Sequence, residues 1–263
     1  MMKRFKILVI IICACLLQVQ AQALRMGAER TEKLLPLLNG KRVALVVNQT
    51  SVVGEGKTHL LDTLLALGVK VKKVFAPEHG FRGNADAGET VKNGRDVESG
   101  LPILSLYGKN KKPSAEQLAD VDVVLFDIQD VGARFYTYLC NLTQLMRAAK
   151  AAGKPVWVLD RPNPIGNTLC EGLILDESRH SSFVGEYAVP TRYALTVGEY
   201  ARYINTEKGI VQMKLNGEIA DERLISIACG TRPNVVPGTA VAVLAGDWRE
   251  QAAGRFEVED EDC

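Results

Sequence analysis

The sequence lacks a dominant charge and most of the familiar nucleotide-binding and hydrolase motifs. Its 32 lysines and arginines nearly balance 31 aspartates and glutamates, which leaves a formal net charge of +1. So small a net charge argues against a broad basic surface for nucleic acid or for an anionic membrane. No predicted strand is followed by G-x-G-x-x-G, and neither a P-loop nor a G-x-S-x-G elbow is present. These absences disfavour nucleic-acid partners, dinucleotide cofactors and serine hydrolase chemistry.

Histidine and cysteine, the usual zinc ligands, are sparse and unsuitably spaced. His59, His79 and His180 form neither H-x3-H nor H-E-x-x-H, and the six cysteines include no C-x2-C pair. A metal site is therefore weakly supported, and we expect no cofactor. The cysteines beyond the first residues are widely scattered. Isolated cysteines are favoured over disulfides, although an oxidising compartment would permit disulfides.

The first residues have the pattern of a secretory signal peptide. Three basic residues precede the apolar run Ile7–Leu17, which is too short to span a bilayer comfortably. Cleavage after Ala21 would remove residues 1–21 and leave a periplasmic or secreted protein. We expect no stable membrane span after cleavage. A lipid anchor on Cys15 is the alternative.

Apolar runs of strand length alternate with helical patterns along the rest of the chain. Such continuous apolar runs suit strands that are covered on both faces of a parallel sheet. The predicted strands are 43–47, 69–75, 101–107, 121–126 and 155–159, and the predicted helices are 28–38, 58–67, 114 onward, 135–152 and 196–204. The alternation predicts an α/β fold with a parallel sheet and helices on both faces.

Two of the predicted helices begin with a capping box. Ser114 is followed three residues later by Gln117, and Thr196 is followed by Glu199. In this arrangement each side chain bonds the backbone N–H of the other residue. Gly153 ends the long helix before the last predicted strand of the series.

Polar clusters follow four of the predicted strands. Right-handed crossovers place the carboxyl ends of parallel strands at one edge of the sheet, and ligands bind in α/β sheets at that edge. Loops at the opposite edge are short and plain, so the polar clusters predict a functional site. The clusters contain Asn48 and Gln49, Glu78 and His79, the segment Asp127–Arg134, and the segment Asp160–Asn163.

The cluster after the second strand is the best candidate for catalysis. It places Glu78, His79 and Arg82 between two glycines and a proline. A glycosidase needs one carboxyl that is protonated near neutral pH and often a second that stays ionised. Glu78 is the predicted catalytic acid, with Asp127 or Asp130 as the second carboxylate. His79 is predicted to orient Glu78 or to contact the substrate.

Several of these segments also have simpler structural interpretations. Asp127–Arg134 would serve as an acidic helix N-terminus with one internal ion pair. Asp160–Arg161 would serve as a structural pair in a proline-rich turn. The basic run Lys109–Lys112 is interpreted as a solvated turn rather than a binding patch. Gly83–Gly100 is either a lid over the site or a surface loop.

Three blocks resemble the hallmark sequences of the NamZ-type exo-β-N-acetylmuramidases, a family long known only as a domain of unknown function. The blocks are long and specific, and the resemblance extends over most of the chain beyond the signal segment. They are Phe75–Gly83, Asp127–Tyr138 and Leu159–Pro164, and shorter similar stretches occur at Pro190–Tyr193 and Leu195–Glu199.

The resemblance implies a Rossmann-like catalytic domain over residues 22–170, with the site in a cleft, and a smaller C-terminal region over residues 171–263. It implies exo-hydrolysis of N-acetylmuramic acid from the non-reducing end of peptidoglycan fragments, without nucleotide or metal. The family's proposed catalytic glutamate corresponds to Glu78. From about residue 211 the chain departs from the family pattern, so we expect the C-terminal region to be partial or divergent.

We therefore expect an exported exo-muramidase that acts on a peptidoglycan-derived muropeptide or disaccharide. One of the site arginines is predicted to pair with the lactyl carboxylate of muramic acid, because Arg suits bidentate carboxylate recognition. The predicted substrate-binding residues are Asn48, Gln49, Arg82, Arg134, Tyr136, Asp160, Arg161 and Asn163.

Two alternative functions stay open at this point. The first is a non-catalytic muramic acid or peptidoglycan-binding remnant that has lost its activity together with its C-terminal domain. The second and weaker alternative is a metal-dependent hydrolase that uses His79 with Glu78 and Asp130.

Overall fold

The computed structural model describes residues 24–83, 93–208, 214–215, 218–219 and 224–227. The predicted signal segment 1–21, the alternative anchor Cys15 and half of the predicted lid segment lie outside the described residues. Within the described part of the chain, no helix has the length and apolar character needed to cross a membrane.

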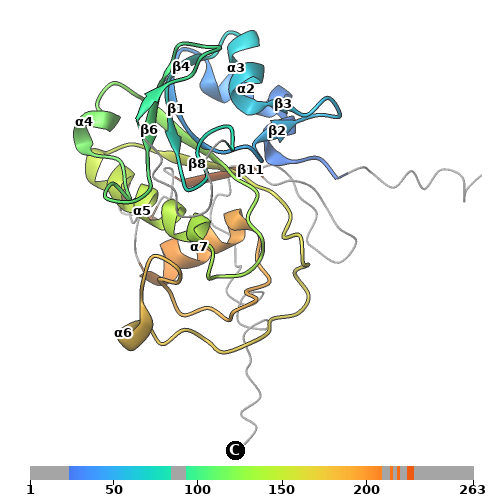
Figure 1. Cartoon of the computed structure of the whole chain (residues 1–263), viewed down its shortest axis with the longest axis vertical. Helices are drawn as coiled ribbons and strands as arrows, with labels where there is room; N and C mark the ends of the chain where they lie inside the picture. The colour runs from blue at the N-terminus through green and yellow to red at the C-terminus, as the bar shows by residue number, and fades with distance from the viewer. Residues whose placement is uncertain (1–23, 84–92, 209–213, 216–217, 220–223, 228–263) are drawn as a thin grey trace, which may run out of the picture.

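A seven-stranded sheet forms the centre of the molecule (Figure 1). Six of its strands pair in parallel, and only the short edge strand β5 runs antiparallel to its neighbour β6. The strands are β1 (Arg42–Val47), β4 (Lys70–Ala76), β5 (Gly94–Arg95), β6 (Pro102–Ser105), β7 (Val123–Asp127), β8 (Val156–Leu159) and β11 (Leu224–Ile227). The predicted α/β class with a parallel sheet is confirmed.

The strand order identifies the sheet as Rossmann-like. It reads β11-β8-β7-β1-β4-β6-β5, so the chain builds outward from β1 in one direction and then returns to build from β7 in the other. The six parallel strands thus follow the doubly wound order 3-2-1-4-5-6. The order reverses between β1 and β7. In such sheets the crevice beyond the carboxyl ends of these two strands is the usual place for a ligand.

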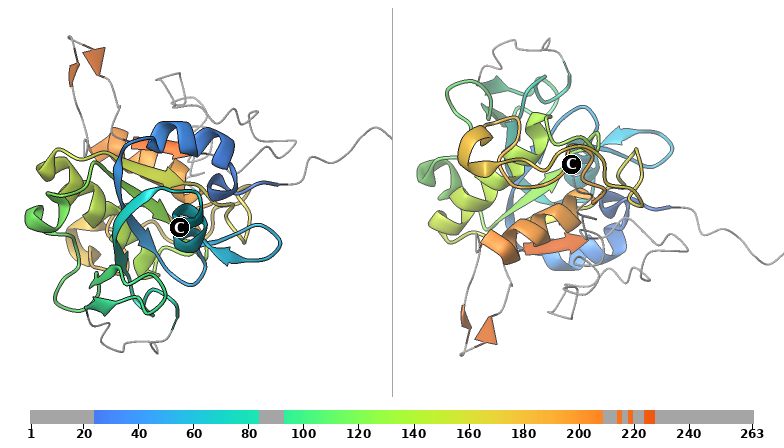
Figure 2. Two further views of the ribbon diagram at one scale, coloured as in Figure 1. Left: turned by 90° about the horizontal axis from the view of Figure 1, so that it is seen from above. Right: turned by 90° about the horizontal axis from the view of Figure 1, so that it is seen from below.

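Helices cover both faces of the sheet, as the sequence predicts (Figures 1 and 2). One face packs on α2 and α3, and the other packs on α4, α5 and α7. These helices are α2 (Thr31–Leu38), α3 (Leu60–Ala66), α4 (Ala115–Leu118), α5 (Thr137–Ala152) and α7 (Val197–Lys208). The smaller elements are η1 (Gly27–Glu29), β2 (Val52–Val53), β3 (Thr58–His59), α6 (Glu177–His180), β9 (Lys214–Leu215) and β10 (Glu218–Ile219).

The strand β1 illustrates why the apolar runs are continuous. Val43, Leu45 and Val47 pack with α2 and α3, whereas Ala44 and Val46 pack on the α5 side. Successive side chains of a strand point to opposite faces. Since both faces are covered by helices, every position of the strand after its first residue must be apolar.

The capping predictions are confirmed, and several helices have other boundaries than predicted. Ser114 Oγ accepts a hydrogen bond from Gln117 N at 3.2 Å, and Thr196 Oγ1 accepts one from Glu199 N at 3.1 Å. The helix predicted to begin at residue 58 begins at Leu60 instead. Thr58 and His59 pair with β2 in a small antiparallel hairpin, and the His59 side chain then caps the helix.

Segments after residue 170 contribute to this same fold. Tyr200 and Ile204 of α7 lie in the core cluster that also contains residues of α5. The strand β11 pairs in parallel with β8 and extends the sheet at that edge. The long connection between β8 and α7 carries only the short helix α6 and runs around the lower side of the molecule in Figure 1.

Candidate active site

Glu78 lies in a tight loop just after the end of β4. Pro77 and Phe81 are buried on either side, and the Phe81 ring packs edge-on against His59 at a centroid distance of 4.7 Å. His79 has a φ of +70°, and Gly80 continues with a φ of +79°. A left-handed histidine costs conformational energy, which the two anchored flanks compensate. The loop therefore presents Glu78 and His79, both half-buried, at the carboxyl edge of the sheet.

Two hydroxyl groups hold the Glu78 carboxylate. Thr137 Oγ1 donates to Glu78 Oε2 at 3.1 Å. The Tyr107 hydroxyl also hydrogen-bonds Glu78, which raises the pKa of that tyrosine. Thr137 is the first residue of α5, where the helix dipole favours a negative charge. Glu78 is thus positioned by the ends of β4 and β6 and by the start of α5.

Aromatic side chains surround this carboxylate on the α5 side. Tyr138 is buried, and burial together with the nearby charges of Glu78 and Asp130 raises its pKa. The ring of Tyr136 lies 6.4 Å from that of Tyr138 and 5.7 Å from that of Phe135. Tyr136 and Phe135 are both exposed. They present an apolar surface with a hydroxyl group just before the start of α5.

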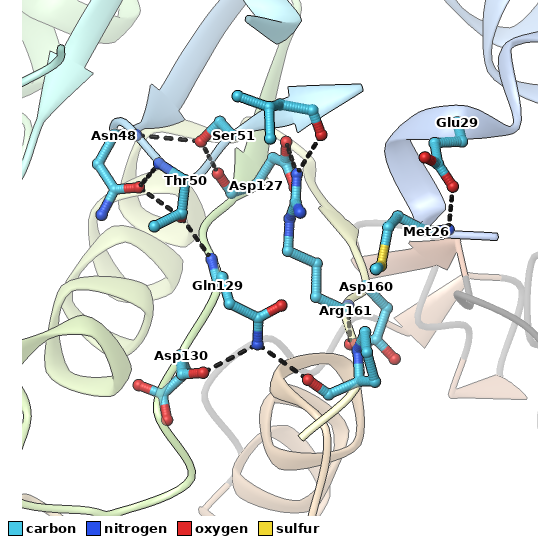
Figure 3. A network of polar contacts seen from close by, with 12 residues as sticks. Met26, Glu29, Asn48, Thr50, Ser51, Asp127, Gln129, Asp130, Asp160 and Arg161 are labelled. Carbon is cyan, nitrogen blue, oxygen red and sulfur yellow. Dashed lines mark hydrogen bonds and ion pairs between the residues drawn. The ribbon is translucent and has the colours of Figure 1, made fainter. Parts of the chain in front are cut away.

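Asp127, the last residue of β7, is fully buried in an ion pair (Figure 3). Arg161 approaches it with Nε at 2.6 Å from Oδ1 and Nη2 at 3.0 Å from Oδ2, and Nη2 also donates to the Val52 carbonyl at 3.1 Å. Burial raises the pKa of Asp127, and the bidentate arginine counteracts that effect. The pair joins the ends of β7 and β8 to the β2 hairpin.

Asp130 is also buried, but it keeps one oxygen free of protein donors. Its Oδ2 accepts hydrogen bonds from the Tyr193 hydroxyl and from Gly132 N, the latter at 2.8 Å. Its Oδ1 has no partner among the described residues. Burial raises the pKa of Asp130. Of the two predicted second carboxylates, Asp130 is the one with an unused acceptor.

A network of short polar contacts ties the ends of β1 and β7 together (Figure 3). Asn48 Oδ1 accepts from Thr50 N at 2.9 Å and from Thr50 Oγ1 at 2.6 Å. Thr50 Oγ1 accepts in turn from Gln129 N at 2.9 Å, and the Gln129 amide reaches the Pro162 carbonyl. Ser51 Oγ donates to the Asp127 carbonyl. Asn48 is fully buried. It follows β1 directly, so it lies where the strand order reverses between β1 and β7.

The three arginines, one of which is predicted to pair with the lactyl carboxylate, all make contacts within the protein. Arg82 pairs with Asp96 at 3.0 Å and with Asp62 at 3.1 Å, and it holds the pKa of Asp96 down at about 2. Arg134 donates to the carbonyls of Leu173 and Val189 rather than to either site aspartate. Arg161 is committed to Asp127. Their predicted substrate contacts stay predictions.

Asp160 and Asn163 shape the loop after β8. Asp160 caps α7, because its Oδ1 accepts from Gly198 N at 2.8 Å and its Oδ2 accepts from Thr196 Oγ1 at 2.7 Å. Burial raises the pKa of Asp160 to about 7 against the effect of these donors. Asn163 donates to the Leu195 carbonyl at 3.0 Å and is almost completely buried. Both side chains therefore have structural contacts in addition to their predicted binding role.

Gln49 is the more accessible of the two predicted binding residues that follow β1. Its side chain is exposed and lies against Gly83, so that a β-carbon on that glycine would stand 3.1 Å from Gln49 Cγ. The β1 loop and the end of the Glu78 loop therefore touch. Among the residues that the structure describes, no three His, Cys, Asp or Glu side chains gather in a way that would hold a metal ion.

Four residues at this site were not singled out from the sequence. Tyr107, Tyr138 and Thr137 surround Glu78, and Tyr193 supports Asp130. Thr137 and Tyr138 belong to the block Asp127–Tyr138, which resembles the family sequence. That resemblance could have identified them as site residues. Tyr107 ends the predicted strand 101–107. Its position at the same edge of the sheet as Glu78 could have identified it as a site residue.

Gly132 allows the segments after β7 and β8 to approach each other, and we expect Gly132→Ala to destabilise the protein. Its φ is +86°, and an added β-carbon would collide with Asn163 Oδ1 and stand 2.6 Å from Ile165 Cγ1. Backbone strain and overpacking together should cost about 2–4 kcal/mol in the free energy of unfolding by urea. Gly108→Ala is the control, because its φ is +74° with no atom within 4 Å. Equal losses in the two variants would contradict the proposed close approach.

A known protein family and one of its characterised members are similar in sequence to this chain. A family model described as exo-beta-N-acetylmuramidase NamZ, N-terminal, matches residues 43–229. The match extends beyond the predicted departure at about residue 211. The peptidoglycan beta-N-acetylmuramidase NamZ of Bacillus subtilis (strain 168) is 46% identical over 173 residues, which cover 66% of this chain and 42% of that protein.

Two crystal structures of DUF1343 family proteins from Bacteroides fragilis NCTC 9343 are also similar. Each is 36% identical, with TM-scores of 0.66 and 0.65. The matches cover 77% and 84% of this chain, and 49% and 55% of the two solved chains. The chain therefore spans less than half the length of the curated relative and about half of these structures. The resemblance inferred from the sequence blocks is confirmed, and the chain belongs to the NamZ family of exo-β-N-acetylmuramidases.

Proposed function

We propose that the chain is an exo-acting glycoside hydrolase that releases N-acetylmuramic acid from the non-reducing end of peptidoglycan fragments. The observation that carries the proposal is the position of Glu78. This carboxyl is half-buried at the carboxyl edge of a Rossmann-like sheet, and the hydroxyls of Thr137 and Tyr107 orient it. The muramidase named among the relatives supports the sugar specificity.

In this proposal Glu78 protonates the glycosidic oxygen as the bond from that oxygen to C1 breaks. A water molecule supplies the hydroxyl group at C1, either directly or after the second carboxylate has formed a covalent intermediate there. A general acid must be held within hydrogen-bonding reach of the atom that it protonates, and the two hydroxyl contacts fix the carboxyl for that task. Asp130 is the favoured second carboxylate, because Asp127 is already paired with Arg161 and Asp130 Oδ1 has no partner among the described residues. The exposed ring of Tyr136 would contact the sugar.

Export and a role in cell-wall turnover form part of the same proposal. They rest on the basic and apolar pattern of residues 1–21 and on the location of peptidoglycan outside the inner membrane. The substrate would be a muropeptide or a disaccharide in the periplasm or the medium.

A second candidate function is binding without hydrolysis. The observation that favours it is the share of the relative that the chain matches, 42% of its length. The hydrolytic activity in that relative's name belongs to the whole protein and not to the matched region alone.

The test is turnover of a chromogenic β-glycoside of N-acetylmuramic acid, with the corresponding N-acetylglucosamine glycoside as the control substrate. The proposal predicts release of the chromophore from the muramic acid glycoside and at most slow release from the control. Titration calorimetry with N-acetylmuramic acid separates the two candidates. Binding without turnover would support the non-catalytic function, whereas neither binding nor turnover would contradict both.

A further inference from the structure

The two oxygens of the Asp130 carboxyl group differ in their surroundings. Oδ2 accepts hydrogen bonds from the Tyr193 hydroxyl and from Gly132 N, whereas Oδ1 has no donor among the described residues. Asp130 is only 2% exposed, and a buried carboxyl stays ionised only if donors compensate for the lost water. The donors on Oδ2 therefore decide how readily this carboxyl ionises and fix the orientation of Oδ1.

Tyr193 is held in place by its packing and by the backbone that follows it. Its ring is buried and lies 5.9 Å from the ring of Tyr200 on α7. The next residue, Ala194, has a φ of +54°, a left-handed conformation that costs energy in any residue other than glycine. Asn163 Nδ2 donates to the Leu195 carbonyl at 3.0 Å and fixes the chain one residue further on. The Tyr193 hydroxyl therefore has little freedom to move.

The segment before Tyr193 lies directly beside the segment that follows Asp130. Arg134 N donates to the Thr191 carbonyl at 2.9 Å, and the neighbouring residues form an antiparallel bridge. Tyr193 belongs to the part of the chain after residue 170, which the sequence assigns to a separate C-terminal region. A residue of that part thus reaches the candidate site and contacts one of its carboxyl groups.

The other titratable groups around this contact supply no positive charge. Burial and the charge of Asp130 raise the pKa of Tyr138 on α5 and of Tyr200 on α7. Tyr138 also senses the charge of Glu78, and Tyr193 senses that of Asp160 after β8. Within the described part of the chain, no lysine or arginine forms an ion pair with Asp130. The neutral donors on Oδ2 therefore take the place of a cation.

We propose that Tyr193 is a positioning residue, whose hydroxyl keeps Asp130 ionised and directs its Oδ1 for the reaction. This inference rests on the proposed function, in which Asp130 is the second carboxylate. That group must be ionised either to accept a proton from the attacking water or to form a bond to C1. Tyr193 keeps its own proton in both cases, and Glu78 gives its proton to the departing oxygen.

The first test is the pH profile of kcat/KM for the muramic acid glycoside in Tyr193→Phe. Phenylalanine keeps the ring that packs on Tyr200 but removes the donor. Loss of a donor to the charged form raises the pKa of Asp130, so the acidic limb should move upward by about one to two pH units. Below the limb, turnover should be about tenfold lower or less than that, and it should return toward the parent value above the limb. The alkaline limb, which Glu78 sets, should stay in place.

Tyr187→Phe is the matched control. Tyr187 lies in the same connection between β8 and α7 and is also buried, and its hydroxyl accepts from Arg147 Nη2 at 2.6 Å. Removal of this hydroxyl should leave the acidic limb where it is in the parent protein. An unshifted limb in Tyr193→Phe, an equal loss of turnover at every pH, or a Tyr193→Phe protein that does not fold would mark the Tyr193 hydroxyl as structural only and would overturn the proposal.

The second test does not depend on hydrolysis. The carboxyl ¹³C NMR signal of Asp130, assigned by its loss in Asp130→Asn, is titrated with pH in the whole protein. Its midpoint should lie about one to two pH units higher in Tyr193→Phe than in the parent protein. Equal midpoints would reject the role of Tyr193 even if the glycoside is cleaved. A shifted midpoint in a protein that cleaves no glycoside would support the control of Asp130 by Tyr193 and would count against the proposed hydrolysis alone.

Discussion

Glu78→Gln should reduce turnover of the muramic acid glycoside by about 10²–10⁴-fold in kcat, the usual contribution of a general acid. Glutamine keeps the shape of glutamate and an oxygen that can accept from Thr137 Oγ1, but it has no acidic proton to give to the leaving group. KM should change little, because the loss concerns the transition state rather than ground-state binding.

Glu55→Gln provides the matched control for this experiment. Glu55 is an exposed residue in the turn between β2 and β3, away from the α5 end of the site. The control should retain full activity, and both variants should unfold at the temperature of the parent protein. Turnover by Glu78→Gln within a factor of two of the parent would remove Glu78 from the role of general acid.

Asp127→Ala should lower the free energy of unfolding by about 3–5 kcal/mol, because it leaves the Arg161 guanidinium buried without its counter-charge. Arg161 has only a twentieth of its side chain exposed and Asp127 has none. Denaturation by urea, followed by circular dichroism, measures the loss. A large loss would identify the pair as a structural joint between β7, β8 and the β2 hairpin.

Two further variants separate charge burial from simple loss of contacts. Glu32→Gln removes one partner of the Arg25–Glu32 pair, whose side chains are 50% and 52% exposed, and should cost about 1 kcal/mol or less. The double variant Asp127→Leu/Arg161→Met removes both buried charges and should be less destabilised than Asp127→Ala. A cost for Asp127→Ala as small as that for Glu32→Gln would contradict the account of the buried pair.

Much of the sheet follows from the sequence because its strands are covered on both faces. Every interior position of a strand such as β1 or β7 must be apolar, so the strands appear as continuous apolar runs. The position of Glu78 follows for a related reason. A carboxylate, an imidazole and a glycine directly after such a run lie at the edge where parallel strands deliver their loops.

The partners that the charged residues bind could not be predicted in the same way, because those partners are distant in the chain. Arg82 finds Asp62 on α3 and Asp96 within the predicted lid segment, and Arg134 finds backbone carbonyls of the loop after β8. The residue types indicated that arginines lie near the site. Only the tertiary contacts show that these arginines already form ion pairs or hydrogen bonds within the protein.

The pairing of β11 with β8 has a consequence for synthesis on the ribosome. β8 ends at Leu159, and its outer edge is completed only when residues 224–227 arrive. At about 5–20 residues per second, a nascent chain would wait several seconds with an apolar strand edge unpaired. Unpaired edges are templates for aggregation. The late strand therefore makes the interval between residues 159 and 224 the period in which a growing chain most needs protection by a chaperone.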